Sequence, residues 1–368
     1  MNKIIYLDAA ASALKSKSVI DAEVGFLQNS YANTGRGICP RAAAADAMLA
    51  HSREYVADFI GAESVSQVVF TSGTTDAMNR IVHIVCGSRD VKTIAVSDLD
   101  HHSARMPWEN VVRVSGGKLI KIPLTDSYDL DYKKMPVADV VVITAMSNVL
   151  GVAQDVGAIV ASARAQNPNV ITIVDAAQYV AHAPIDVRTW GCDFMCFSGH
   201  KIGANTGVGI MYIKNPDSFA PDKFGGGMVQ TISGDKWNID SAPNKFEAGT
   251  LPLTQIAALP VAIDAWREWA GGADIISYIY DILSEMPHIK LLTVRDAKII
   301  SFVVDNMHVL DFGALIGAHN ICVRVGNMCA SWIHSVMSID GSIRISVGPW
   351  NTLDDAKCVV DTIRGIVK

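Results

Sequence analysis

The chain has 368 residues, 50% of them hydrophobic, and its net charge at neutral pH is −6. This length suits two domains, or one large domain with an appendage, around a sizeable buried core. The acidic balance, without a basic stripe, argues against nucleic acid as a partner. The first residues, MNKIIYLDAAAS, lack the charged start, apolar run and cleavage site of a signal peptide. No apolar segment reaches membrane-spanning length.

The seven cysteines are odd in number and scattered, which does not indicate a disulfide framework. Cys192 and Cys196 lack a second pair at a zinc-binding spacing, so no metal site is expected. We therefore expect a protein of a reducing compartment, most simply the cytoplasm, without membrane association.

Up to residue 213, short β-branched runs alternate with longer alanine-rich segments. The expected strands are 68–71, 93–97, 140–145, 170–175, 194–198 and 207–213, and the clearest helices between them are 75–86 and 156–166. This alternation predicts an α/β fold, a mostly parallel sheet covered on both faces.

A region rich in Gly, Pro and polar residues follows at 224–250, and then a helical stretch at 253–269. Beyond it the pattern predicts a smaller α+β unit. Its expected strands are 290–293, 299–304, 321–325 and 342–347, and its expected helices are 309–318 and 353–366.

Polar residues gather where the first group of strands ends, and open parallel sheets bind ligands at those ends. Gly73-Thr74-Thr75 follows one strand and opens a helix, which suits phosphate. Thr75 as a simple helix cap is the alternative. His101 follows the next strand, and its ring could stack on an aromatic ligand or lie in a solvated loop.

Two further strands end in residues that a core strand does not need. Asp175 closes one strand, with Gln178 three residues on, and either caps a helix or faces a buried cation. The stretch CFSGHKIG places Ser198, His200 and Lys201 at the end of the next strand.

Each feature is ambiguous alone, but in this order the set fits pyridoxal phosphate. The amine of Lys201 would bond to the cofactor's aldehyde, and Asp175 would keep the ring nitrogen protonated so that the ring acts as an electron sink. Ser198 and His200 can donate hydrogen bonds to the phosphate.

The motifs that follow one another along almost the whole chain are YLDAAAS (6–12), TSGTTDAMN (71–79), DHHSARMPW (100–108), SNVLG (147–151), VDAAQ (174–178), SGHK (198–201), GGG (225–227), FEAGT (246–250), RVGNMCA (324–330) and IRISVGPWNT (343–352). With these motifs the chain resembles the class V aminotransferase family of fold-type I pyridoxal-phosphate enzymes. Within that family it is similar to the cysteine desulfurases of the SUF type and to selenocysteine lyases.

The resemblance implies a large cofactor-binding domain over residues 15–250, with a mostly parallel seven-stranded sheet. It also implies a smaller α+β domain made of residues 1–14 and 251–368, and a homodimer. Lys201 would carry protons, Gln178 would contact the ring oxygen, and His101 would stack on the ring. The phosphate would be held by Gly73, Thr74, Thr75, Ser198 and His200, with Thr250 reaching in from the second subunit.

The resemblance also assigns the substrate contacts. Arg344 would hold the substrate carboxylate, helped by Asn148, because a guanidinium fork matches a carboxylate; a surface strand charge is the alternative. Cys329 would attack the sulfur of L-cysteine, become a persulfide, and pass sulfur to an acceptor protein for iron–sulfur clusters or thio-cofactors, leaving L-alanine.

The chain departs from the family where histidines are usual, with Gly35 and Cys39 around Arg36, and with Asn327 and Met328 before Cys329. These departures bear on the sulfur acceptor and on the rate. Three alternatives remain open: a selenocysteine lyase, another class V enzyme such as a C–S lyase, aminotransferase or epimerase, and a weakly active scaffold for sulfur transfer.

Overall fold

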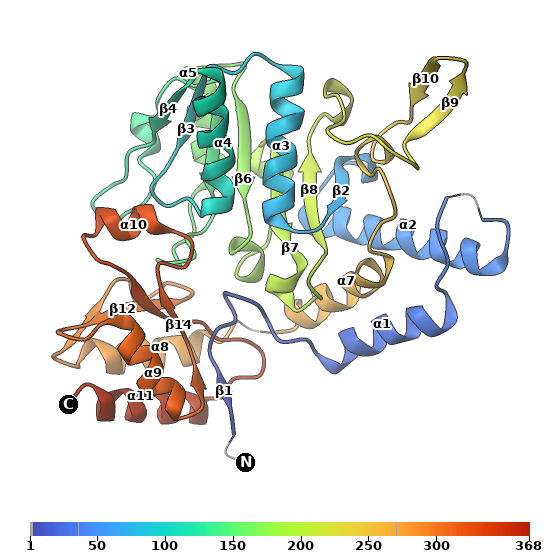
Figure 1. Cartoon of the computed structure of the whole chain (residues 1–368). Helices are drawn as coiled ribbons and strands as arrows, with labels where there is room; N and C mark the ends of the chain where they lie inside the picture. The colour runs from blue at the N-terminus through green and yellow to red at the C-terminus, as the bar shows by residue number, and fades with distance from the viewer. Residues whose placement is uncertain (1–2, 36, 270) are drawn as a thin grey trace.

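The computed structural model describes residues 3–35, 37–269 and 271–368, and its centre is a seven-stranded sheet (Figure 1). The strand order is β2-β8-β7-β6-β5-β3-β4, and all neighbours are parallel except β8, which runs against β2 and β7. The bounds are β2 (Val68–Thr71), β3 (Thr93–Val96), β4 (Lys118–Lys121), β5 (Val140–Thr144), β6 (Ile171–Asp175), β7 (Phe194–Ser198) and β8 (Gly209–Ile213). The predicted α/β class and mostly parallel sheet are confirmed.

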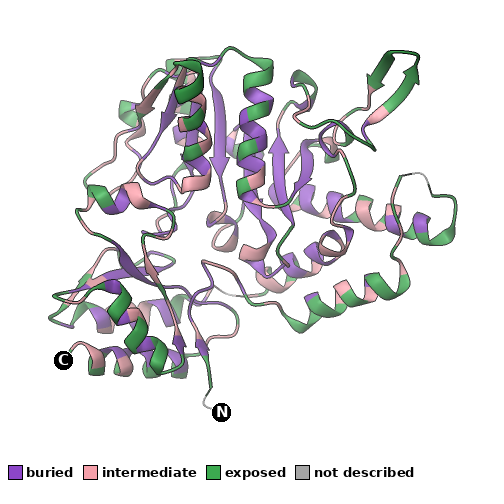
Figure 2. Cartoon of the chain, viewed as in Figure 1, coloured by how far each residue is buried: buried purple, intermediate pink, exposed green. Residues whose placement is uncertain are grey.

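The central strands of the sheet, which are continuous apolar runs, are buried on both faces (Figure 2), whereas the edge strand β4 is partly exposed. In β5, Val140 and Val142 pack toward α3 (Thr74–Ser88) and α4 (His102–Ser115). The alternating residues Val141 and Ile143 belong to the opposite core. That core is closed by α2 (Pro40–Ile60), α5 (Val156–Gln166) and α7 (Leu253–Arg267), with the short α6 (Val187–Trp190) beside α5.

A second, antiparallel sheet has the order β11-β12-β15-β14. Its strands are β11 (Ile289–Leu291), β12 (Ile300–Val304), β14 (Arg324–Gly326) and β15 (Ser342–Ile345), and its core includes residues of α8 (Ala273–Ser284), α9 (Val309–Ala318) and α11 (Leu353–Ile366). The start of the chain joins this part, since β1 (Ile5–Tyr6) pairs in parallel with β13 (Ile321–Cys322). The division into domains at residues 14 and 250 stays a prediction.

The expected strand 321–325 was wrong as a single strand. Ile321–Cys322 pairs with β1, whereas Arg324–Gly326 pairs with β15, so the run serves two partners in turn. The sequence patterns also missed α10 (Ser331–Val336) and the hairpin of β9 (Val229–Ser233) and β10 (Lys236–Ile239), which projects from the body in Figure 1. Its residues are mostly exposed, and hence give little apolar periodicity.

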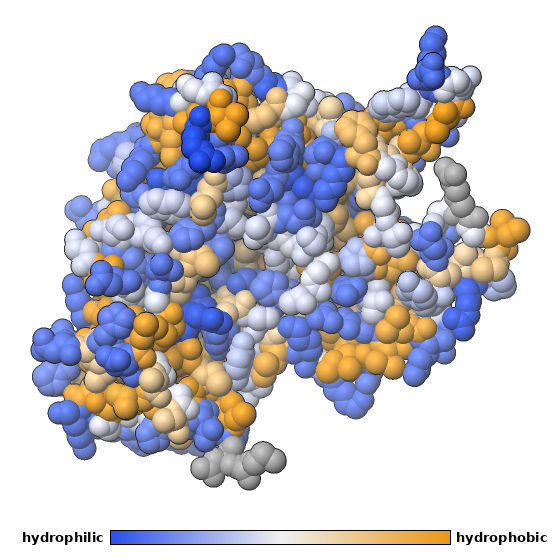
Figure 3. All heavy atoms as spheres, viewed as in Figure 1, coloured by the Kyte–Doolittle hydropathy of each residue, from blue (hydrophilic) through white to orange (hydrophobic). Residues whose placement is uncertain are grey.

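Helix α1 (Lys17–Asn29) packs on α7 but leaves an apolar stripe exposed. Ile20, Val24 and Leu27 are about half exposed. Figure 3 shows apolar surface in the region of this helix. In the described parts of the chain, no helix combines the length and apolar character that crossing a membrane requires.

Candidate active site

A cavity of about 350 Å³ lies at the ends of the central strands, between the large sheet and residues of the small one. Its walls contain every predicted site residue except Gly73 and Thr250. They are Thr74, Thr75, His101, Asn148, Asp175, Gln178, Ser198, His200, Lys201, Cys329 and Arg344, together with Arg324. Residues far apart in sequence meet here because parallel strands end at one edge of a sheet.

The N-terminus of α3 forms a tight cradle beside the end of β7. The Ser198 hydroxyl accepts the backbone N–H of Thr74 at 2.7 Å and lies 2.8 Å from the Thr74 hydroxyl. Gly73 has a φ of 147°, and a Cβ on Gly209 would lie 2.5 Å from the Cα of Gly73. A helix N-terminus with two hydroxyls and no side chain in the way suits an anion such as phosphate.

Asp175 and Lys201 follow the neighbouring strands β6 and β7. Burial raises the pKa of Asp175 to about 6, although the N–H of Ala177 donates to its carboxylate at 2.9 Å. Burial, followed by the charge of Arg344, lowers the pKa of Lys201 to about 8. The Lys201 amine donates to the carbonyl oxygen of Ala10 at 2.6 Å, so it already lies in the cavity. A ring nitrogen cation beside Asp175 would favour its ionised form.

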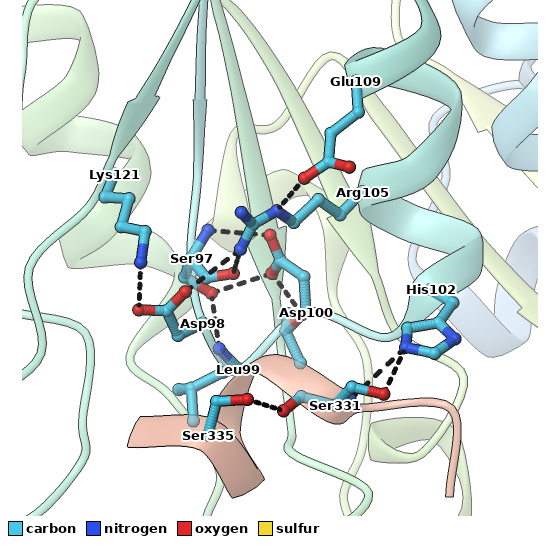
Figure 4. A network of polar contacts seen from close by, with 11 residues as sticks. Ser97, Asp98, Leu99, Asp100, His102, Arg105, Glu109, Lys121, Ser331 and Ser335 are labelled. Atoms are coloured by element: carbon cyan, nitrogen blue, oxygen red, sulfur yellow. Dashed lines mark hydrogen bonds and ion pairs between the residues drawn. The ribbon is translucent and has the colours of Figure 1, made fainter. Parts of the chain in front are cut away.

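His101 follows β3 and precedes α4, in a loop that a buried carboxylate holds (Figure 4). Asp100 accepts hydrogen bonds from the N–H and hydroxyl of Ser97, both at 2.8 Å, and from the Thr144 hydroxyl at 2.7 Å. Burial first, and then the charge of Lys201, lower the pKa of His101 to about 4. Its ring is therefore neutral at physiological pH, which suits stacking on an aromatic ligand and accepting a proton.

Three buried polar atoms of the cavity residues have no hydrogen-bond partner within the described residues. They are Gln178 Oε1, His200 Nδ1 and Arg344 Nε. Buried polar atoms are almost always paired, so these atoms indicate that a polar ligand completes the site. The site fits pyridoxal phosphate part by part. The anion cradle suits its phosphate, and the ionisable carboxylate suits its ring nitrogen. The flat imidazole suits the face of its ring, and the buried lysine suits its aldehyde.

The opposite wall carries two arginines that share one carboxylate. Arg344 on β15 is buried and donates to the carbonyl oxygen of Asn148 at 3.0 Å and to Asp8 Oδ1 at 3.1 Å. Arg324 on β14 donates to Asp8 Oδ2 at 2.5 Å, and about half of its side chain is exposed. The two guanidinium groups give this wall positive charge, suited to a substrate carboxylate.

Cys329 lies in a short loop after β14, where two consecutive residues have left-handed backbones. The φ values are 52° for Met328 and 55° for Cys329. Asn148 Nδ2 donates to the carbonyl oxygen of Met328 at 2.8 Å, and the N–H of His102 donates to that of Cys329 at 2.8 Å. Cys329 is exposed, and it borders both the cavity and an outer groove of about 670 Å³ between α3 and α4.

Some predicted residues lie elsewhere. Thr250 is exposed and lies outside the cavity of its own chain, so its role in a second subunit's site stays a prediction. Cys39 caps α2 at an exposed position, Gly35 is also exposed, and Arg36 lies outside the described residues. Asn327 accepts the N–H of Cys329 at 3.3 Å, a role in shaping the loop.

Sequence reasoning missed Asp8 and His102 as parts of the site. Asp8 stands in the motif YLDAAAS, but its partners follow more than 300 residues later. His102 was visible only as the neighbour of His101. One signal could have indicated both residues: each is a polar residue inside a family motif, and neither had been given a role.

Comparison with known proteins agrees with this geometry. The family model described as aminotransferase class-V matches residues 5–359. A probable cysteine desulfurase of Vibrio cholerae is 32% identical over 100% of this chain and 94% of its own length. A cysteine desulfurase of Yersinia pestis is 32% identical over 99% of this chain and 94% of its own length.

Two solved structures extend the similarity to the whole fold. The apo structure of a cysteine desulfurase from Thermococcus onnurineus superposes with a TM-score of 0.93 at 29% identity, covering 100% of this chain and 95% of that one. A cysteine desulfurase from Escherichia coli gives 0.90 at 28% identity, covering 98% and 94%.

Proposed function

Because the chain belongs to the class V aminotransferase family, whose members depend on pyridoxal phosphate, we propose that it is a cysteine desulfurase. The observation that carries this proposal is that Cys329 borders the same cavity as Lys201 and Arg344. A lysine alone would suit many reactions of amino acids. An exposed thiol beside a carboxylate-binding arginine adds a nucleophile for the side chain of a bound amino acid.

The cofactor would be held by residues of the large sheet. The phosphate would be bound by Thr74, Thr75, Ser198 and His200. Asp175 would pair with the ring nitrogen, and His101 would stack on the ring. Gln178 supplies an unpaired amide oxygen and a side-chain nitrogen that donates to Ala10. When bound, the cofactor withdraws electrons from the α-carbon of the amino acid.

Each step on L-cysteine is then assigned to residues of this chain. Arg344 and Asn148 hold the carboxylate, and the Lys201 amine takes the α-proton and returns a proton to carbon. The thiolate of Cys329 attacks the substrate sulfur, so that a sulfur–sulfur bond forms and the carbon–sulfur bond breaks. The electron pair of the broken carbon–sulfur bond goes to the carbon, which gains a proton, so that L-alanine forms. Cys329 keeps the substrate sulfur as a persulfide.

The persulfide sulfur would pass to an acceptor protein used in iron–sulfur or thio-cofactor assembly. The position of Cys329 at the border with the outer groove supports this step, because the groove gives an acceptor thiol access from outside the cavity. Selenocysteine is an alternative substrate with the same contacts. A cytoplasmic location belongs to the same proposal.

A homodimer is also part of the proposal. Thr250 is exposed outside its own cavity, and the apolar stripe on α1 offers surface for a second copy. Mass determination by light scattering tests this point. A monomeric mass at micromolar concentration would overturn it.

Product analysis tests the reaction. The cofactor-loaded protein should convert L-cysteine to alanine without any keto acid, and Lys201→Ala should lose this conversion. Pyruvate and ammonia would show a lyase instead, and dependence on a keto acid would show an aminotransferase. No product together with an unchanged cofactor spectrum would leave only a scaffold role.

A further inference from the structure

Arg105 on α4 is buried, and hydrogen-bond acceptors surround the edge of its guanidinium group (Figure 4). Its Nε donates to Glu109 at 2.8 Å, and its Nη1 donates to Asp98 at 3.1 Å and to the carbonyl oxygen of Ser97 at 3.3 Å. Guanidinium N–H groups point outward in the plane of the group, so these bonds occupy its edge. The flat face of the guanidinium group is left for another partner.

That partner is the indole ring of Trp332. The guanidinium carbon of Arg105 lies 4.0 Å from the centroid of the ring. Trp332 lies in the first turn of α10, three residues after Cys329. The π-electrons of an indole attract a cation over its face, and the attraction is stronger where water is excluded. Arg105 thus connects α4 of the large sheet to the helix that follows the thiol loop.

The position of α10 depends on such contacts with the large sheet. The helix has six residues, and a helix this short is not stable on its own. It lies between β14 and β15 of the small sheet in sequence, yet Ala330 and Ile333 at its start are buried in a core of the large sheet. The left-handed backbones of Met328 and Cys329 also have to be held by their surroundings. The contacts of α10 therefore decide where the Cys329 thiol lies relative to a substrate.

From this arrangement, we propose that Arg105 is a positioning residue for the thiol of Cys329. It acts through the ring of Trp332 rather than by contact with substrate, since neither residue is among those that line the cavity. The proposal rests on the proposed function, because persulfide formation requires the thiol to meet the substrate sulfur at reacting distance. A small displacement of α10 would then slow this step without weakening substrate binding.

The test measures persulfide formation on Cys329 in a single turnover of the cofactor-loaded protein with L-cysteine. Trp332→Leu keeps an apolar side chain but removes the ring face, and should slow this step by about tenfold. Trp332→Phe keeps a ring face and should stay within about threefold of the native rate. Binding of L-alanine, followed by the absorbance of the cofactor, should be unchanged in both variants, because Arg344 and Lys201 are not disturbed.

The contact can also be removed from its other side. Arg105→Gln removes the cation and should give the same loss as Trp332→Leu, and the double variant should lose no more than either single variant. If Arg105→Gln does not fold, because two carboxylates lose their partner, the two Trp332 variants decide the proposal alone. The matched control is Phe59→Leu, since the Arg267 guanidinium lies 4.8 Å from the Phe59 ring and neither residue is among those that line the cavity. It should leave persulfide formation unchanged.

Three kinetic outcomes would overturn the proposal: a native rate in Trp332→Leu, an equal loss in Trp332→Phe, and losses that add in the double variant. Weaker binding of L-alanine in step with the slower persulfide would also overturn it, because Trp332 would then have a general structural role.

Hydrogen exchange of the peptide 327–336 adds a measurement that needs no turnover. Exchange should be faster in Trp332→Leu than in the native protein and in Trp332→Phe, and equal exchange in all three would contradict the proposal. A native protein that forms no persulfide would refute the proposed function, and the exchange comparison would still test the role of the contact between Arg105 and Trp332.

Discussion

The backbone N–H of His102 donates to the carbonyl oxygen of Cys329 at 2.8 Å, which joins the start of α4 to the thiol loop. The His102 ring continues this connection, since its Nε2 lies 3.1 Å from the hydroxyl of Ser331 on α10 (Figure 4). Trp332 packs against the same ring at 5.0 Å and lies under the Arg105 guanidinium at 4.0 Å. The residue after His101 thus holds the loop that carries Cys329.

His102→Ala should slow persulfide formation by about tenfold while leaving cofactor affinity unchanged. The left-handed backbones of Met328 and Cys329 cost roughly 1–3 kcal/mol each, and the ring contacts help to hold them. Rapid-quench measurement of persulfide, alongside titration with pyridoxal phosphate, separates the two effects. Ser335→Ala is the matched control, because its hydroxyl donates to the Ser331 carbonyl from the exposed side of α10. A parallel loss of cofactor affinity would point to a general structural role of His102.

Capture of pyridoxal phosphate by the cofactor-free protein should speed up as pH rises through about 8. Only the neutral amine of Lys201 attacks an aldehyde, and burial holds its pKa at about 8. Arg344→Gln removes the next contribution to this lowering, so the midpoint should move to higher pH. Stopped-flow absorbance between pH 6 and 10 gives both midpoints. Equal midpoints for the two proteins would contradict the electrostatic coupling of Lys201 and Arg344.

Asp175→Asn should stabilise the cofactor-free protein at pH 8 but not at pH 4. Burial raises the folded-state pKa of Asp175 to about 6, above its unfolded value of 3.8, so the folded state prefers the protonated form. Below the unfolded pKa this group changes nothing, and the destabilisation grows as pH rises and is complete above about 6. An asparagine can still accept the N–H of Ala177.

Urea unfolding at the two pH values measures this effect, with an expected gain of about 1–3 kcal/mol at pH 8. The variant should also lose activity, since the ring nitrogen would lack its carboxylate. An equal gain at both pH values would show that the effect does not arise from ionisation.

Most strands of the central sheet could be predicted from the sequence, because they are apolar runs that end in a polar residue. Asp175 and Lys201 stood out for that reason, and both line the cavity. The strands of the small sheet were harder to predict, because residues 321–326 pair first with β1 and then with β15. Local periodicity does not record such a change of partner.

Contacts over long sequence separations account for what the patterns missed at the site. Asp8 meets arginines more than 300 residues away, and His102 meets Ser331 across 229 residues. Neither pairing leaves a periodic trace in the chain. The role of the exposed Thr250 stays a prediction, because it depends on a second subunit.

The most direct test of the central claim is one turnover with L-cysteine, followed by mass spectrometry of the peptide that contains Cys329. The native protein should gain one sulfur atom on Cys329 for each alanine released, and Cys329→Ala should form neither product while still binding pyridoxal phosphate. Cys358→Ala, at another exposed cysteine, serves as the control. Alanine formed at the native rate by Cys329→Ala would contradict the account, because the sulfur would then leave without this thiol.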